Sequence, residues 1–178
     1  MQPNKSALTL RGKALYKQER QMYRPVINWL RATLKDAHPG YSQKVFNTSR
    51  TKLQALIERE GLHHLFPLFP TYEIMVDVTA ILKRGRLAYL GFVECKLNPI
   101  SLKDIGQLWG YAKVAQPIFA LIVSPSGVSE AVRQLLQVHQ RYEILDYAPA
   151  RKIRVAIWDS RRGEVLSKSV IPPGGPLV

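Results

Sequence analysis

Two carboxylates and a lysine come together at one end of a predicted β-hairpin. Asp77 lies on the first strand, and Glu94, Cys95 and Lys96 end the second. Because strand side chains alternate between faces, Glu94 and Lys96 should project to one side and Cys95 to the other. Asp77, Glu94 and the Cys95 carbonyl could hold a hard divalent cation, Mg²⁺ or Mn²⁺, beside a water molecule. With Lys96 assisting that water, these groups suffice to hydrolyse a phosphodiester.

The alternative for Glu94 and Lys96 is a surface ion pair at the end of an edge strand. Against it, residues 90–93 make the strand before Glu94 strongly apolar, and Asp77 is flanked by apolar residues at 74–76 and at 78. A charge in such surroundings must be paired or bound to a ligand. The sequence therefore favours a wet pocket at the end of the hairpin.

Glu19 is a candidate third carboxylate. A first helix is predicted over about residues 14–36, and Glu19 falls inside its apolar stripe at about 100° per residue. A carboxylate on a core-facing stripe needs a cationic partner or a metal, bound directly or through water. Pairing with Arg20, Arg24 or another helix neighbour is the alternative, and the sequence does not choose between them. The stripe consists of Leu15, Met22, Val26, Trp29 and Leu30.

Gln107 lies on a second candidate helix for the site. Ser101 and Asp104 form a capping-box pattern, which predicts a helix to about residue 115. Gln107 lies away from its apolar stripe and shares the other side with Lys103 and Tyr111, so this polar ridge faces either the active site or solvent. The stripe consists of Leu102, Ile105, Trp109 and Ala112.

The charge balance points to a polyanionic partner. The 178 residues carry 26 Lys+Arg against 13 Asp+Glu, a net charge of +13. Residues 1–60 hold twelve of the basic residues and four of the acidic ones. Such an excess favours nucleic acid through phosphate contacts, with an anionic membrane surface as the competing partner. No apolar run approaches the ~20 residues of a spanning helix, and a single cysteine indicates a reducing, cytoplasmic location.

The remaining elements indicate an α/β fold. We expect one domain over residues 1–171, followed by a flexible, proline-rich tail at 172–178. The hairpin strands are predicted at 72–82 and 87–96. A second helix should run from Asn47 or Thr48 to Gly61, and residues 62–70 should be irregular, with at most a short strand. A buried strand is expected at 118–124, a helix at 128–140, and further strands at 144–147, 152–158 and 165–170.

Together these features resemble the PD-(D/E)xK nuclease superfamily, over about residues 14–125. The resemblance rests on Val76-Asp77, where valine replaces the motif's proline, on Glu94-Cys95-Lys96, on the helix with Gln107 and Tyr111, on the strand at 118–124, and on Glu19. It implies a restriction-endonuclease-like mixed sheet flanked by helices, here with extra C-terminal strands at about 143–170. Small archaeal Holliday-junction resolvases share this order of elements.

The resemblance also implies roles for the residues. Glu19, Asp77 and Glu94 would bind Mg²⁺ or Mn²⁺, Lys96 would assist the water, and Gln107 would orient the site. We therefore expect a metal-dependent DNA endonuclease, and cleavage of both strands would require two sites, as in a homodimer. The alternatives are a catalytically inactive nucleic-acid-binding protein with the same fold and a basic structural or membrane-surface protein.

Overall fold

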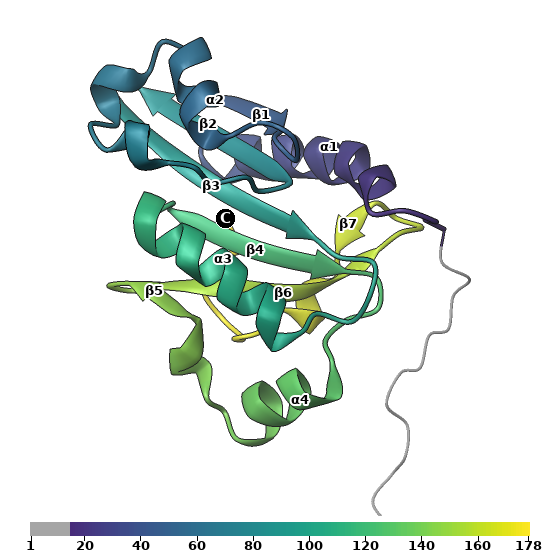
Figure 1. The fold of residues 1–178 in the computed structure, drawn as a ribbon. Coiled ribbons are helices and arrows are strands. Elements are labelled where there is room, and N and C mark those ends of the chain that lie inside the picture. Colours follow the sequence, from purple (N-terminus) through teal and green to yellow (C-terminus); the bar gives the residue numbers. More distant parts are fainter. Residues whose placement is uncertain (1–14) are drawn as a thin grey trace, which may run out of the picture.

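The apolar segments of the chain form a mixed β-sheet with helices on both faces (Figure 1). The computed structural model describes residues 15–178, and within them the sheet has seven strands in the order β1-β2-β3-β4-β6-β5, with β7 pairing with β6. The pairs β1–β2 and β2–β3 are antiparallel, whereas β3–β4 and β4–β6 are parallel. The chain is therefore an α/β protein with a mixed sheet.

The elements follow one another with short connections. The helices are α1 (Arg20–Ala37), α2 (Leu53–Arg59), α3 (Leu102–Ala115) and α4 (Glu130–Arg133), which continues as a π-helix over Gln134–Val138. Short 3₁₀ turns occupy His63–Leu65, Phe69–Thr71, Tyr142–Leu145 and Ser167–Ser169. The strands are β1 (Ser42–Asn47), β2 (Val78–Arg84), β3 (Leu87–Cys95), β4 (Phe119–Ser124), β5 (Asp146–Ala148), β6 (Arg151–Asp159) and β7 (Glu164–Val165).

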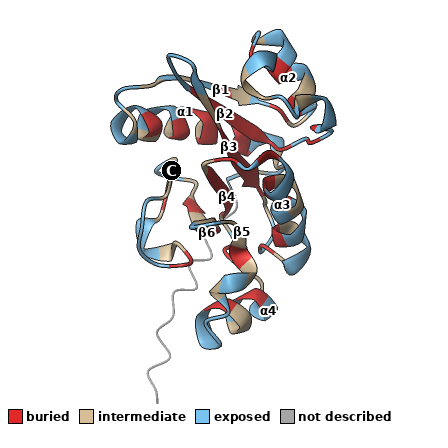
Figure 2. Ribbon diagram, turned by 90° about the vertical axis from the view of Figure 1, so that its left-hand side faces the viewer, coloured by how far each residue is buried: buried red, intermediate tan, exposed pale blue. Residues whose placement is uncertain are grey.

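Each face of the sheet carries its own hydrophobic core (Figure 2). On one face α1 packs Met22, Val26 and Leu30 against the strands, and all three side chains are fully buried. On the other face α2 and α3 cover the sheet, with Leu56 and Leu108 among the buried residues. Burial of both faces explains why the central strand β4 is apolar and buried along its whole length, as the sequence predicts.

The hairpin turn, its second strand and the capped helix are confirmed, but the first strand begins at Val78 rather than at residue 72, so Asp77 lies just before it and not on it. β2 and β3 pair from Val78↔Val93 to Arg84↔Leu87, with the turn at Gly85 and Arg86. The side chain of Ser101 accepts from the Asp104 N–H, and the Asp104 carboxylate accepts from the Ser101 N–H, which completes the capping box of α3. The turn and the capping box depend on residues close together in the sequence, which is why the sequence predicts them correctly.

The segment before the hairpin differs from the prediction. Residues Ser42–Asn47 form the edge strand β1, where the sequence analysis predicted no element, and α2 begins at Leu53 rather than at Asn47 or Thr48. Thr48 does not cap a helix, because its hydroxyl donates to the Val76 carbonyl at 2.7 Å and its N–H donates to the Asp77 carbonyl at 2.9 Å. Residues 62–70 contain 3₁₀ turns and no strand.

Two helix predictions also need correction. The first helix starts at Arg20, and Leu15, expected in its stripe, is 59% exposed ahead of it; residue 14 lies outside the described residues. On α3, Leu102 and Trp109 are exposed, and Leu108 and Ala115 are buried in their place. The indole N–H of Trp109 donates to the Asp146 carbonyl at 2.8 Å, which holds this aromatic side chain at the rim.

Among the C-terminal strands, the one predicted at 152–158 is confirmed as β6, whereas the other two are shorter than predicted. The strand expected at 144–147 is a 3₁₀ turn followed by β5, and the one expected at 165–170 ends at Val165. Ile171 then bridges to Val155, and Leu177 and Val178 pack against the core beneath α1. The flexibility expected for the tail stays a prediction.

Gly91 on β3 should not tolerate a side chain. A Cβ there would lie 2.1 Å from Cζ of the buried Phe119 ring. We expect Gly91→Ala to lower the free energy of unfolding by about 1–3 kcal/mol, because the ring must leave its packed position. The matched control is Gly106→Ala on α3, where nothing lies within 4 Å; it should raise stability by about 0.5–1 kcal/mol. Equal denaturation midpoints for the two variants would contradict this packing.

Candidate active site

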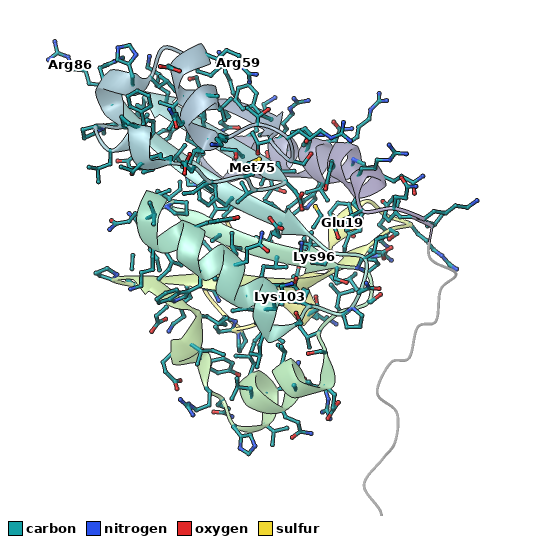
Figure 3. All side chains as sticks on the ribbon, viewed as in Figure 1. Glu19, Arg59, Met75, Arg86, Lys96 and Lys103 are labelled. Atoms are coloured by element: carbon teal, nitrogen blue, oxygen red, sulfur yellow. The ribbon has the colours of Figure 1, made fainter. Side chains whose placement is uncertain are left out.

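The predicted pairing of Glu94 and Lys96 is present at the end of β3. Lys96 Nζ lies 2.9 Å from Glu94 Oε1, so the two side chains do project to the same side. Lys96 Nζ also lies 3.6 Å from Glu19 Oε1, and Figure 3 shows Glu19 and Lys96 side by side at the arrow end of the strand. Glu19 is the residue that precedes α1, so the start of this helix is brought to the end of the hairpin. We call Glu19, Asp77, Glu94 and Lys96 the carboxylate–lysine cluster.

Asp77 joins this cluster from the residue before β2. Extending the register Val78↔Val93 by one step places Asp77 opposite Glu94. Asp77 Oδ2 accepts a hydrogen bond from the Cys95 N–H at 2.9 Å, and its own carbonyl accepts from the Thr48 N–H at 2.9 Å. Asp77 is 7% exposed. Its carboxylate is therefore fixed by the ends of both hairpin strands and cannot turn away to solvent.

Glu94 is the carboxylate of the cluster whose burial is least compensated. It is 5% exposed, and while Lys96 contacts Oε1, the buried Oε2 has no hydrogen-bond partner within residues 15–178. Desolvation, followed by the negative charge of Asp77, raises the pKa of Glu94 to about 7 in spite of Lys96. The Asp77 N–H is near enough to oppose this rise in pKa weakly, but it forms no hydrogen bond with Oε2.

The other members of the cluster are perturbed by the same burial. Desolvation raises the pKa of Asp77, outweighing the Cys95 N–H, the Tyr23 hydroxyl and Lys96. Desolvation also raises the pKa of Glu19, against the pull of Lys96. For Lys96, desolvation disfavours the charged form, but the carboxylates of Glu94, Glu19 and Asp77 outweigh it and raise its pKa. Lys96 is therefore a permanent cation at neutral pH.

Tyr23 is a member of the site that the sequence analysis missed. Its hydroxyl is directed at the Asp77 carboxylate, and desolvation together with Asp77 raises the pKa of the phenol, which stays protonated and can donate. Tyr23 comes four residues after Glu19, and residues spaced by four share one face of a helix. That spacing was the available signal, but only the packing of α1 on the sheet shows which residue Tyr23 meets.

Gln107 is exposed on α3, and within the described residues no hydrogen bond links it to the cluster. Trp109 faces β5 through its bond to Asp146. Gln107 lies about 160° around the helix from Trp109, on the flank nearer β3, because successive residues turn by about 100°. This orientation is consistent with Gln107 lying beside the cluster. Its role in the site stays a prediction.

The cluster offers oxygen ligands suited to a cation, but its side chains do not form a complete coordination shell. Within residues 15–178, no group of three or more His, Cys, Asp or Glu side chains forms a ready-made metal centre. The residues present nevertheless fit a hard divalent cation, because Glu94 Oε2 is buried without a partner beside the second carboxylate of Asp77. Mg²⁺ needs only one or two carboxylates and keeps several waters. Cys95 is a buried free cysteine, and only its backbone carbonyl remains a candidate ligand.

A cavity of about 680 Å³ lies elsewhere, between β6, β7 and the residues after β7. It is lined by apolar side chains, including Val128, Ile157 and Leu166, and by polar ones, including Arg162 and Lys168, but by no member of the carboxylate–lysine cluster. The cavity therefore belongs to the C-terminal part of the fold, separate from the charged site.

Comparisons with known proteins give no match: neither a protein-family model nor a curated protein nor a solved structure is similar to this chain. Among residues 15–178, no helix is both long and apolar enough to cross a membrane.

Replacing Glu94 by glutamine should stabilise the fold at alkaline pH. A carboxyl group whose pKa is raised from 4.5 to about 7 by folding binds its proton more tightly in the folded state. Stability is therefore fully present below about pH 4.5 and is lost as the pH rises to about 7. The gap between the two pKa values corresponds to about 3 kcal/mol. In chelator, Glu94→Gln should unfold at higher denaturant than wild type at pH 8.

At pH 4.5 the same two proteins should unfold at nearly the same denaturant concentration, because wild-type Glu94 is then protonated. The control is Glu73→Gln, whose side chain is 72% exposed. A stabilisation of Glu94→Gln that is independent of pH would contradict the buried, uncompensated carboxylate.

Proposed function

We propose that this protein is a metal-dependent endonuclease that hydrolyses phosphodiester bonds of DNA. The observation that carries the proposal is the pair of buried carboxylates, Asp77 and Glu94, with the free Oε2 of Glu94 and a lysine held beside them. Burying two carboxylates against a single lysine is costly, and strongly perturbed groups of this kind concentrate at functional sites.

A divalent cation bound there would neutralise the phosphate and lower the pKa of a bound water. Asp77 and Glu94 would hold it, with the Cys95 carbonyl as a third ligand and Glu19 acting directly or through water. These residues supply oxygen ligands, which Mg²⁺ and Mn²⁺ prefer.

Lys96 would act as a hydrogen-bond donor and a positive charge, and not as a general base. Its pKa is raised by three surrounding carboxylates, so it holds its proton at neutral pH. It can therefore donate a hydrogen bond and offer positive charge where negative charge develops on the phosphate. The carboxylates of Glu94 and Glu19 fix its position, at 2.9 and 3.6 Å.

The order of the elements supports a restriction-endonuclease-like core. Glu19 precedes α1, Asp77 and Glu94 lie at the ends of a hairpin, Gln107 is on the next helix, and the buried strand β4 follows. This is the order on which the resemblance to the PD-(D/E)xK superfamily rests. The net charge of +13 supports nucleic acid as the substrate, and cleavage of both strands would call for a homodimer.

One observation favours a second candidate, an inactive nucleic-acid-binding protein of the same fold. The Lys96–Glu94 ion pair at 2.9 Å already satisfies one carboxylate oxygen without a metal. In that case the cluster would be a structural ion pair left at the end of the hairpin.

Loss of the Glu94 carboxylate should abolish cleavage but not binding. We expect wild type to nick a panel of labelled duplex, branched and single-stranded DNAs in Mg²⁺ or Mn²⁺, and Glu94→Ala to be inactive because a principal ligand is missing. Salt-sensitive DNA binding should persist in the variant. Glu73→Ala, which removes an exposed glutamate paired with Lys52, should cleave like wild type. Equal activity of Glu94→Ala and wild type would refute the assignment.

Affinity for Mn²⁺ separates the enzyme from the inactive binder. Calorimetry should detect Mn²⁺ binding to wild type that weakens below about pH 7, because Glu94 has a pKa of about 7 and must lose its proton to act as a ligand. Asp77→Asn should bind Mn²⁺ at least tenfold more weakly at every pH. Absence of Mn²⁺ binding to wild type at pH 8 would favour the inactive binder.

A further inference from the structure

We infer that the exposed flank of α1 binds the phosphate backbone of nucleic acid and leads that backbone to the carboxylate–lysine cluster. The inference rests on the proposed function, because it assigns the substrate contacts of the same site. It commits to one element, whereas the sequence shows only that basic residues are abundant.

The flank carries four basic residues in line, Arg20, Arg24, Arg31 and Lys35, which we call the basic stripe. Because successive helix residues turn by about 100°, the four lie within an arc of about 60° and extend over about 22 Å. All four are exposed. Phosphates of one strand succeed each other at about 3.4 Å along a duplex, so the stripe spans about six of them.

The positive charges of the basic stripe are not neutralised by acidic side chains of residues 15–178. Among residues 15–178, no member of the basic stripe forms an ion pair. Residues 1–14 contain no aspartate or glutamate that could serve as a partner. Arg31 alone makes a hydrogen bond to the fold, from Nη2 to the Val45 carbonyl of β1 at 3.0 Å, which places this flank beside the edge strand.

The position of Arg20, the first residue of α1, is unfavourable for the helix itself, whereas Lys35 in the last turn is favourably placed. The N-terminal end of a helix carries partial positive charge, and basic side chains there destabilise it by a few tenths of a kcal/mol to about 1 kcal/mol. The first turn of α1 has no acidic residue, and Arg20 and Arg24 occupy its N-terminal part. Helix stability alone would favour an acidic residue at position 20, so Arg20 is consistent with an external anion as its partner.

The burial of α1 argues against an anionic membrane as that partner. An interfacial helix inserts its apolar face into the lipid. The apolar face of α1 is already packed on the sheet, with Met22, Val26 and Leu30 fully buried. The outward side of the helix is exposed in Figure 2, and the stripe offers charge without apolar anchors.

The basic stripe begins beside the carboxylate–lysine cluster. Arg20 follows Glu19, whose carboxylate is 3.6 Å from Lys96 Nζ, and Tyr23 of the same helix reaches Asp77. A backbone lying on the stripe therefore arrives at the carboxylates from the N-terminal end of α1. The amide of the exposed Asn28 fills the gap between Arg24 and Arg31 and can also donate to phosphate.

The test is the triple variant Arg20→Gln/Arg24→Gln/Lys35→Gln, which leaves the anchored Arg31 in place. Its binding to a labelled duplex is measured in chelator over a range of salt concentrations. Loss of three phosphate contacts should make the slope of log K against log salt shallower by about 2–3 and weaken binding roughly 100-fold at physiological salt. The thermal midpoint should change little, because the variant removes one unfavourable charge from the first turn (Arg20) and one favourable charge from the last turn (Lys35).

The matched control is Lys83→Gln/Arg86→Gln/Lys168→Gln, which removes the same net charge elsewhere. These residues are exposed, and Arg86 lies at the far end of the hairpin from Lys96 (Figure 3). The control should bind much more tightly than the stripe variant. Equal losses in the two variants would overturn the inference, since binding would then follow net charge alone.

Three further outcomes are decisive. If wild type binds vesicles containing phosphatidylserine as tightly as DNA, and the stripe variant loses both, the partner is a membrane and the inference fails. If the stripe variant loses DNA binding but wild type cleaves nothing in Mg²⁺ or Mn²⁺, the stripe stands and the proposed activity fails. If wild type cleaves and the stripe variant binds and cleaves equally, the activity stands and the stripe fails.

Discussion

The buried carboxylate of Glu94 is the constraint on which the arrangement of the rest of the site depends. It lies beside a second buried carboxylate, Asp77, and only one lysine contacts it. A charge removed from water needs compensation, and here one oxygen has none within the described residues. Such an arrangement persists only if the surrounding structure prevents the carboxylate from turning away. The sheet and its two cores provide that restraint.

The restraint follows from the alternation of side chains along β3. Val93 and Cys95 enter the core beneath α1, while Phe92 enters the core on the opposite face, so the backbone at Glu94 is fixed from both sides. The carboxylate of Asp77 is held by the Cys95 N–H and its carbonyl by the Thr48 N–H, which ties the loop after β1 to the residue that precedes β2. The stability of two hydrophobic cores thus offsets the cost of holding two like charges together.

The sequence predicts those parts of the fold and site that depend on local pattern. Alternation places Glu94 with Lys96, and the apolar run at 119–123 identifies the central strand. β1 could not be found in this way, because an edge strand with only Val45 buried carries little apolar signal. The rotation of α3 was equally hidden: Trp109 is apolar enough to suggest the core, yet a hydrogen bond from its indole keeps it at the rim. Tyr23 belongs to the site only through long-range packing.

Helix α1 has three roles in the fold: it packs on the sheet, it contributes residues to the site, and it exposes a basic flank. Its apolar face requires burial on the sheet, and that burial sets the rotation of the whole helix. Once the rotation is set, Tyr23 must reach Asp77, and Glu19 must meet Lys96 at the start of the helix. The same rotation leaves four cations, which form no ion pair within residues 15–178, on the flank beside β1. Helix stability alone does not favour an arginine in the first turn, where Arg20 lies. The packing of α1 therefore links the negative cluster to a positive surface, an arrangement suited to a polyanion whose backbone must reach buried carboxylates.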